Sequence, residues 1–174
     1  MRLRLVLPRR GRRAELRLGR LTRRSAGILL YRLTGGAPEV LIVHPGGPFW
    51  AKKDEGAWSI PKGEHADGED PLACALREFE EETGTALPEG ELIELGIAKQ
   101  RSGKVVRAWA AEGDLDADAI TSNEFELEWP PRSGRRKTFP EVDRAGWFDL
   151  ETAAGKLNPA QVVFLERLRG LVVE

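Results

Sequence analysis

The chain has 174 residues, 41% of them hydrophobic, which is enough to enclose one core in a single domain. Its 27 basic and 28 acidic side chains leave a formal net charge of -1, which excludes a chain-wide attraction to nucleic acid or membranes. The single cysteine, Cys74, excludes an intramolecular disulfide framework and a cysteine-based zinc site. No apolar run approaches the roughly 20 residues that cross a bilayer, so we expect a cytoplasmic protein without a membrane partner.

Residues 1–24 differ in composition from all that follows, with ten arginines against one acid, Glu15. They lack the unbroken apolar segment of a secretory signal. A basic arm for RNA, DNA or an anionic surface is one interpretation, and an arginine-rich organelle transit segment is another. A solvated extension, or upstream sequence included by a misplaced start codon, is the interpretation we favour because the arm carries no motif. We therefore predict a flexible extension over residues 1–24 and one domain over residues 25–174.

The first elements of the domain are predicted to be strands. SAGILLYRL, from Ser25, and EVLIVH, from Glu39, flank a turn at Gly35-Gly36, which is the pattern of a β-hairpin. A loop rich in glycine and proline follows, PGGPFWAKKDEGA, then a short apolar piece at 58–60. The next stretch, PKGEHADGED, is polar and turn-forming.

A helix is predicted to begin after Asp70 and to end at Gly84, because Asp70 can accept a hydrogen bond from the first turn and Pro71 fits that turn. Strands are predicted in ELIELGIAKQ and KVVRAWAAEG, joined by the turn RSGK, and then in NEFELEW and AGWFDL. Asn158-Pro159 is predicted to open a final amphipathic helix. This order indicates an α/β domain, a mixed β-sheet covered by helices, with Trp58, Trp109 and Trp147 in the core.

Positions 77 to 84 read REFEEETG, an unusual concentration of glutamates. Like charges three or four residues apart on a helix repel by roughly 0.2–0.5 kcal/mol per pair. On a helix over 71–83, Glu78, Glu81 and Glu82 lie on the side opposite the apolar face, whereas Glu80 points elsewhere. Such a face is commonly just solvated. Next to a turn-forming loop, however, it also offers the carboxylate oxygens that Mg²⁺ prefers.

The segment GEHADGEDPLACALREFEEETGT, residues 63–85, resembles the Nudix box, G-x5-E-x7-R-E-U-x-E-E-x-G-U, where U is a bulky apolar residue. Thr85 departs from the pattern at its last position, where we expect looser packing and no effect on the chemistry. The resemblance implies a Nudix α/β/α sandwich that hydrolyses a nucleoside diphosphate linked to another group. The matching residues are Gly63, Glu69, Arg77, Glu78, Phe79, Glu81, Glu82 and Gly84.

The resemblance also implies roles for these residues. Glu78 and Glu82 would be the principal ligands of Mg²⁺ or Mn²⁺, with Glu81 as an additional ligand and the carbonyl of Lys62 as a backbone ligand. The metal would neutralise phosphate charge and activate a water, with catalytic roles for Glu81 and Glu82. Arg77 would pair with Glu69 to hold the loop on the helix, and Gly63 and Gly84 would be structural.

A proton acceptor is still needed. Nudix proteins often carry a glutamate six residues before a late tryptophan, and Glu141 and Trp147 have this spacing. We predict that Glu141 is the base or a further ligand, with a surface acid as the alternative. Glu124, Glu126 and Glu128 are competing candidates.

The substrate is predicted from cations and an aromatic near the box. GAWSIPKG, which contains Lys62, resembles the form found in Nudix hydrolases of dinucleoside polyphosphates or diphosphoinositol polyphosphates. Lys52, Lys53 and Arg136 are further candidate phosphate contacts, and Trp50 is a candidate base-stacking residue. A dinucleoside polyphosphate or other nucleoside polyphosphate is therefore the expected partner. Hydrolysis of ADP-ribose, a sugar nucleotide or an oxidised nucleotide remains an alternative, as does a non-catalytic nucleotide- or RNA-binding module.

Overall fold

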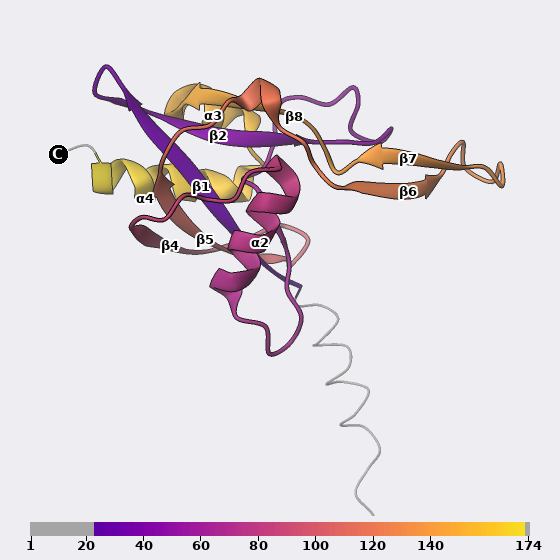
Figure 1. The fold of residues 1–174 in the computed structure, drawn as a ribbon, viewed down its shortest axis with the longest axis horizontal. Coiled ribbons are helices and arrows are strands. Elements are labelled where there is room, and N and C mark those ends of the chain that lie inside the picture. Colours follow the sequence, from indigo (N-terminus) through magenta and orange to yellow (C-terminus); the bar gives the residue numbers. More distant parts are fainter. Residues whose placement is uncertain (1–22, 173–174) are drawn as a thin grey trace, which may run out of the picture.

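The computed structural model describes residues 23–172, and the prediction of a flexible arginine-rich extension falls largely outside this range (Figure 1). In the described range, no helix combines the length and the apolar character that a membrane span requires. The elements in chain order are β1 (Arg24–Thr34), β2 (Ala37–Pro45), β3 (Lys62–Glu64), α2 (Pro71–Thr83), β4 (Leu92–Lys99), β5 (Val105–Glu112), η1 (Ala117–Ala119), β6 (Glu124–Glu128), β7 (Arg136–Pro140), β8 (Val142–Asp149), α3 (Leu150–Lys156), η2 (Pro159–Gln161) and α4 (Val162–Val172).

The central sheet is mixed and has the order β4-β5-β1-β2-β8, with β3 paired to the first part of β1. Strands β1 and β5 run parallel, and the other neighbours are antiparallel. Two predicted hairpins are confirmed: β1–β2 turns at Gly35-Gly36, and β4–β5 turns after Lys99. The predicted mixed sheet is therefore present.

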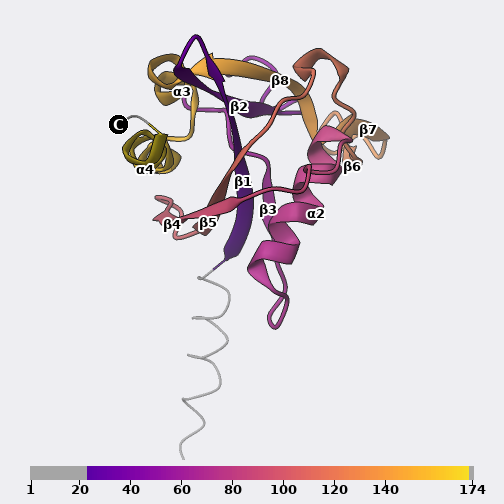
Figure 2. The same ribbon diagram turned by 60° about the vertical axis from the view of Figure 1, so that its left-hand side comes forward.

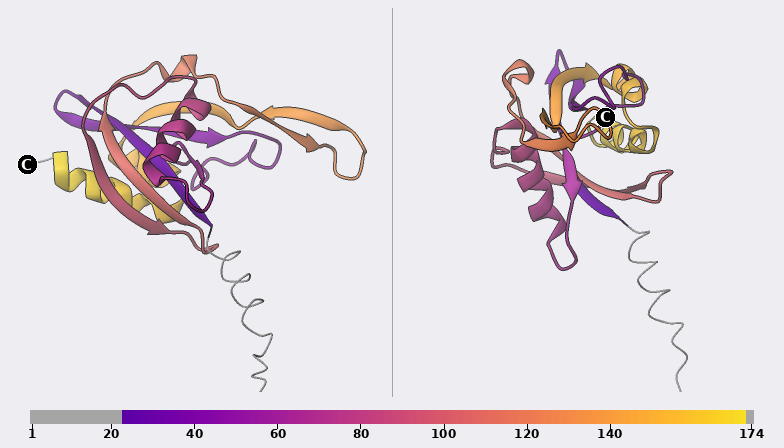
Figure 3. Two further views of the ribbon diagram at one scale, coloured as in Figure 1. Left: turned by 60° about the horizontal axis from the view of Figure 1, so that its bottom comes forward. Right: turned by 90° about the vertical axis from the view of Figure 1, so that its right-hand side faces the viewer.

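Strand β1 is the centre of the domain because both of its faces are buried. Ile28 and Leu30 point toward α2, whereas Leu29 and Tyr31 point toward α3 and α4. This alternation is the two-residue period of a strand with helices on both sides. Figure 2 and the right-hand view of Figure 3 show α2 on one side of the sheet and α3 and α4 on the other. The predicted α/β/α sandwich is confirmed.

Two strands and one α-helix were not predicted. β3 lies in the polar stretch PKGEHADGED, and it is a strand because it pairs with β1 rather than because of its residues. β7 contains two basic residues of RSGRRK and pairs with β6. α3 begins at the end of β8, where the side chain of Asp149 accepts hydrogen bonds from the backbone N–H and the hydroxyl of Thr152. β3 and β7 form because they pair with other strands, and α3 forms where Asp149 caps it. None of these causes produces a hydrophobic periodicity in the sequence.

Strands β6 and β7 form a separate two-stranded sheet that projects from the body of the domain (Figure 1). The left-hand view of Figure 3 shows the same projection. Glu141 lies between β7 and β8, so it marks the point at which the hairpin returns to the central sheet.

Candidate active site

Helix α2 has both predicted ends. The Asp70 side chain accepts a hydrogen bond from Ala73 N–H at 3.1 Å. At the other end, Gly84 adopts φ +77° and its N–H donates to the Glu80 carbonyl at 2.8 Å. This left-handed conformation favours glycine, and a side chain there would also press on the Thr121 carbonyl.

The glutamates of α2 separate as predicted, with Glu80 apart from the other three, but Glu78 and Glu82 lie against β3 rather than on a side that faces solvent. Phe79 is fully buried against the sheet, whereas the Glu78 and Glu81 side chains are 12% and 33% exposed. Glu82 is half-buried and Glu80 is exposed. Three carboxylates therefore share a partly buried region next to the sheet, and Glu80 remains at the surface.

Strand β3 brings the loop before the helix against these carboxylates. The backbone N–H of Lys62 donates to Glu82 Oε2 at 3.1 Å. The adjacent residue, Gly63, lies so close to the Glu78 carboxylate that any Cβ at this position would overlap it. Glycine is therefore required at position 63 because the Glu78 carboxylate occupies the space that a side chain would need.

The backbone of Lys62 faces away from β1. Ile28 N–H donates to Pro61 O at 3.0 Å, and His65 N–H donates to Arg24 O at 3.1 Å. In an antiparallel ladder, hydrogen-bonded pairs of residues alternate with pairs that are not hydrogen-bonded. The pair Lys62 with Gly27 is of the second kind, so the N–H and C=O of Lys62 both point away from β1. Since its N–H already reaches Glu82, its carbonyl oxygen faces the same side.

Arg77 connects the loop and the helix. One of its terminal nitrogens donates to Glu69 at 2.9 Å, as the resemblance implied. The other donates to Glu78 at 3.1 Å and to Glu81 at 3.3 Å. A single guanidinium therefore offsets part of the repulsion among the clustered carboxylates, in addition to its structural role.

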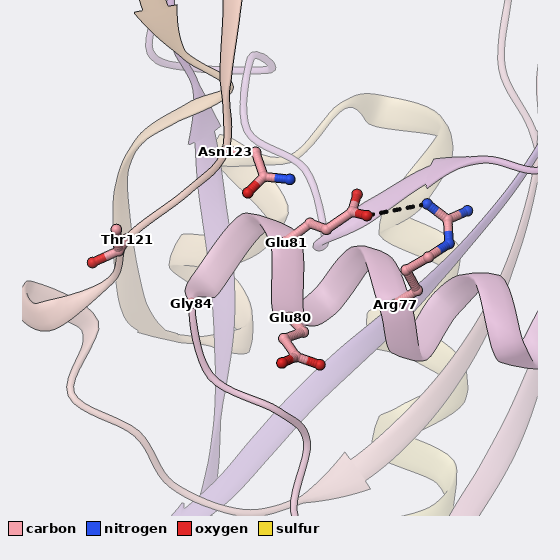
Figure 4. Close-up of a pocket in the computed structure, with 6 residues that line it drawn as sticks. All are labelled: Arg77, Glu80, Glu81, Gly84, Thr121 and Asn123. Carbon is pink, nitrogen blue, oxygen red and sulfur yellow. Dashed lines mark hydrogen bonds and ion pairs between the residues drawn. The ribbon is translucent and has the colours of Figure 1, made fainter.

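Glu141 is held near the helix by backbone hydrogen bonds. Its N–H donates to the Asn123 carbonyl at 2.8 Å, and Asn123 N–H donates to the Glu81 carbonyl at 2.9 Å. Next to this contact is a pocket of about 410 Å³ that opens on the Glu81 side of the helix (Figure 4). The residues that line it are Arg77, Glu80, Glu81, Gly84, Thr121 and Asn123.

The carboxylates influence one another electrostatically. Burial raises the pKa of Glu78, and the charges of Glu81 and Glu141 raise it further, against the lowering effect of Arg77. Burial and the charge of Glu81 raise the pKa of Glu141. Burial raises the pKa of Glu82 despite the nearby Lys62 ammonium. The ionised forms of these glutamates are therefore disfavoured, first by burial and then by the charges of their acidic neighbours.

Lys62 shows the opposite shift. Burial and the neighbouring Lys104 lower the pKa of its ammonium, against the charges of Glu82 and Glu64. The predicted phosphate contact thus lies beside a second cation, Lys104, that the sequence did not indicate.

The donor set suits a hard divalent cation. Carboxylate oxygens and an outward-facing carbonyl are the ligands that Mg²⁺ and Mn²⁺ take, and a bound cation would stabilise the ionised forms that burial disfavours. Within residues 23–172, no three His, Cys, Asp or Glu side chains converge into a preformed metal site. The reason is that Glu82 accepts from Lys62 N–H, while Glu78 and Glu81 are bound to Arg77. Metal binding would require these carboxylates to exchange partners.

The other predicted substrate contacts lie outside this cluster. Trp50, Lys52 and Lys53 are exposed on the loop after β2, where the Lys53 ammonium lies 4.9 Å from the centre of the Trp50 ring. Arg136 lies on β7 and pairs with Glu126 at 3.2 Å. Their roles in substrate binding remain predictions.

The competing acids and the tryptophans are also placed. Glu124, Glu126 and Glu128 are exposed along β6, and Glu126 is paired. Trp58 and Trp109 are in the core, as predicted. Trp147 is half-buried, and its indole N–H donates to the Leu115 carbonyl at 2.9 Å.

Sequence reasoning missed Asn123 and Thr121. Thr121 N–H donates to the Thr83 carbonyl at 3.0 Å, so residues 121–123 follow the end of α2. The loop TSN carries no motif, and its role depends on backbone contacts between distant parts of the chain. Only a structure could have identified it.

Comparison with known proteins agrees with this geometry. The model of the NUDIX domain family matches residues 21–168. RNA pyrophosphohydrolases of Rhizobium meliloti and Agrobacterium fabrum are each 30% identical, over 59% and 64% of this chain and 64% and 68% of their own lengths. The mRNA-decapping protein g5R of African swine fever virus is 53% identical over 36 residues, which is 21% of this chain and only 15% of that protein.

Solved structures show the same fold. The Ap4A hydrolase of C. elegans, in a binary complex, has a TM-score of 0.62 at 20% identity and is covered over 96% of its length by 84% of this chain. The NUDIX domain of Shewanella oneidensis NrtR, in complex with ADP ribose, has a TM-score of 0.59 at 16% identity, with 87% of this chain and 89% of that chain covered. The chain has eight matching positions of the box, this sandwich fold and a family match over most of its length, so it belongs to the Nudix family.

Proposed function

We propose that this protein is a divalent-metal-dependent pyrophosphohydrolase that cleaves a phosphoanhydride bond of a nucleoside polyphosphate. The observation that carries the proposal is the meeting of Glu78, Glu82 and Lys62 at the junction of β3 and α2, where Gly63 leaves space for the Glu78 carboxylate. A solvated acidic helix face would not require a glycine at this position or a backbone N–H donated to one of its carboxylates.

Glu78 and Glu82, with Glu81 and the Lys62 carbonyl, would hold the metal. A bound Mg²⁺ or Mn²⁺ would neutralise phosphate charge and lower the pKa of a water molecule. The role of Arg77 is to position Glu69, and with it the loop before the helix, through their 2.9 Å contact.

Glu141 is our candidate for the group that accepts a proton from the attacking water. Its pKa is raised by burial and by Glu81, which brings its proton affinity closer to that of a useful base at neutral pH. Its backbone is fixed by Asn123, so its side chain starts from a defined point next to the cluster. Glu81 lies nearer the pocket and is the competing candidate.

For the substrate we prefer a dinucleoside polyphosphate. The support is the GAWSIPKG segment, the partly buried Lys62 ammonium next to Lys104 and the similarity in fold to Ap4A hydrolase. A second candidate is the 5′ end of RNA, which the names of the relatives and a basic, aromatic hairpin support. The complete set of box glutamates counts against a non-catalytic binding module.

The test is a panel of substrates with Mg²⁺ or Mn²⁺, and with a chelator as the control. The panel contains diadenosine tetraphosphate, 5′-triphosphorylated RNA, ADP-ribose, ordinary and oxidised nucleoside triphosphates and a diphosphoinositol phosphate, and chromatography resolves the products. We expect metal-dependent release of a phosphate-containing product from one of the first two. No turnover of any substrate with either metal would reject the proposed activity.

A further inference from the structure

The β6–β7 hairpin has two chemically different faces. The cross-strand pairs are Phe125 with Phe139, Leu127 with Lys137 and Glu128 with Arg136, and Trp129 N–H donates to the Arg135 carbonyl at 2.8 Å. Because side chains alternate along a strand, one face gathers aromatic and basic side chains and the other gathers the glutamates of β6. The members of the first, which we call the aromatic-basic face, are Phe125, Leu127, Trp129, Arg135, Lys137 and Phe139.

The aromatic-basic face is opposed by the loop after β2. Phe49 on this loop lies 5.5 Å from Trp129, ring centre to ring centre, with the rings nearly perpendicular. Nearer the body of the domain, a Cβ on Gly47 would touch the Phe125 ring. Phe49 and Trp50 nevertheless stay 60% and 40% exposed. Two segments distant in the sequence thus present aromatic rings to solvent side by side.

Both segments are anchored to the domain. The ring of His44 donates from Nε2 to the Lys53 carbonyl at 2.6 Å, which fixes the far end of the loop. Gly46 N–H donates to the Glu141 carbonyl at 2.9 Å, which fixes its near end to the base of the hairpin. The exposed rings therefore sit on a held framework, and neighbouring exposed rings of this kind commonly mark a binding surface.

The charge on this surface is positive. Among the described residues, Arg132, Arg135 and Lys137 take part in no salt bridge, and Lys52 and Lys53 on the opposing loop take part in none either. The whole chain carries a net charge of -1, so this concentration is local. These cations extend beyond the exposed rings toward the hairpin tip, so a ligand with a single nucleotide would leave some of them without a phosphate. A ligand with a repeated phosphate would contact them all.

We propose that the aromatic-basic face, together with Phe49 and Trp50, binds single-stranded RNA. Exposed aromatic rings stack on unpaired bases, and interleaved cations contact the phosphates, as on other single-strand binding surfaces. The inference rests on the second candidate of the proposed function and deepens it, because Glu141 lies at the base of the hairpin, so one end of an RNA held here would reach the carboxylate cluster. The binding itself does not depend on hydrolysis.

The experiment measures the affinity of the full chain for a fluorescent single-stranded RNA of about eight nucleotides with a 5′-hydroxyl end. This probe contains no phosphoanhydride bond, so a loss of RNA binding and a loss of the proposed hydrolysis are separate results. Removing one stacking ring with Phe49→Ala should weaken binding about tenfold. The double substitution Arg135→Ala with Lys137→Ala should lower the slope of log affinity against log salt by about 1.4, the value for two lost phosphate contacts.

Matched controls lie on another part of the surface. Lys99→Ala with Arg101→Ala removes the same charge at the exposed β4–β5 turn, and Ile97→Ala removes an exposed apolar side chain. We expect both controls to bind RNA like the parent chain. Any contribution of the arginine-rich residues 1–24 is common to all variants.

Three results would overturn the proposal. In the first, the hairpin and loop variants bind RNA as tightly as the controls, so that RNA binds elsewhere or not at all. In the second, single-stranded DNA or duplex RNA binds more tightly than single-stranded RNA. In the third, the variants lose turnover of diadenosine tetraphosphate by the same factor as RNA affinity. That result would mean that the aromatic-basic face binds the second nucleoside of a dinucleotide.

Discussion

The junction of β3 with α2 and the β6–β7 hairpin differ in almost every physical property. The junction is packed against the sheet and acidic, and its polar atoms are engaged with one another, as Lys62 N–H with Glu82 shows. The hairpin projects from the domain and is basic on one face, with rings open to solvent (Figure 1). The packed region has the rigidity that chemistry requires, and the projecting region has the accessible area that recognition requires. Substitutions in each region test this division of roles.

The largest expected effect is on turnover from Glu82→Gln. The substitution removes a negative charge from the predicted metal ligands and keeps the shape of the side chain, so we expect turnover to fall roughly 1,000-fold. The matched control is Glu166→Gln on the exposed side of α4, across the sheet from α2, which should leave turnover near that of the parent chain. Steady-state kinetics and thermal unfolding are measured together. A folded Glu82→Gln variant with normal turnover would show that the junction is not the catalytic region.

Gly63→Ala tests whether the junction needs its close approach. A Cβ at this position would overlap the Glu78 carboxylate, so that side chain must move. Because small displacements of a catalytic group reduce rates strongly, we expect roughly a 100-fold loss of turnover with a modest loss of stability. Gly90→Ala is the control, since a Cβ there meets no atom within 4 Å. Equal kinetics for the two variants would contradict the steric account of the box glycine.

The dependence of stability on pH tests the charge imbalance. Glu78 and Glu141 have pKa values raised above the ordinary 4.5, so the folded chain holds more protons than the unfolded chain just above that pH. Stability in the presence of a chelator should therefore fall as pH rises from about 4.5 toward neutrality, before lysines titrate. Mg²⁺ should raise Tm more at about pH 7 than at about pH 5, because it binds the ionised carboxylates. If Mg²⁺ raised Tm equally at both pH values, the carboxylates would not be its ligands.

The smallest expected effect is on stability from Phe49→Ala. Its ring is 60% exposed, so we expect the free energy of unfolding to change by less than about 0.5 kcal/mol. Phe79→Ala in the packed region should instead destabilise the chain by about 3–5 kcal/mol. Denaturant titration measures both. Similar losses would mean that the exposed ring supports the fold, and that its exposure needs no ligand.

The success of prediction from sequence divides along the same line. The residues of the box that contact one another are close in sequence. The spacings within residues 63–85 place Arg77 against Glu69 and Gly84 at the helix end, so the sequence alone predicts these contacts. The hairpin β1–β2 was equally readable from alternation and a glycine turn. β7 could not be predicted from the sequence, because its strand character comes from pairing with β6. The role of Asn123 could not be predicted either, because its contact with Glu81 joins segments 42 positions apart.

Gly46 and Asn123 each begin one of the two segments that bear the exposed rings, and both are bonded to the backbone of Glu141, one at its carbonyl and the other at its N–H. Glu141 is thus the common pivot of the loop and the hairpin. Through Asn123 the same backbone chain of hydrogen bonds continues to Glu81 at the end of α2. One short peptide segment therefore sets the relative position of the loop, the hairpin and the catalytic helix, and the placement of the Glu141 carboxylate depends on all three.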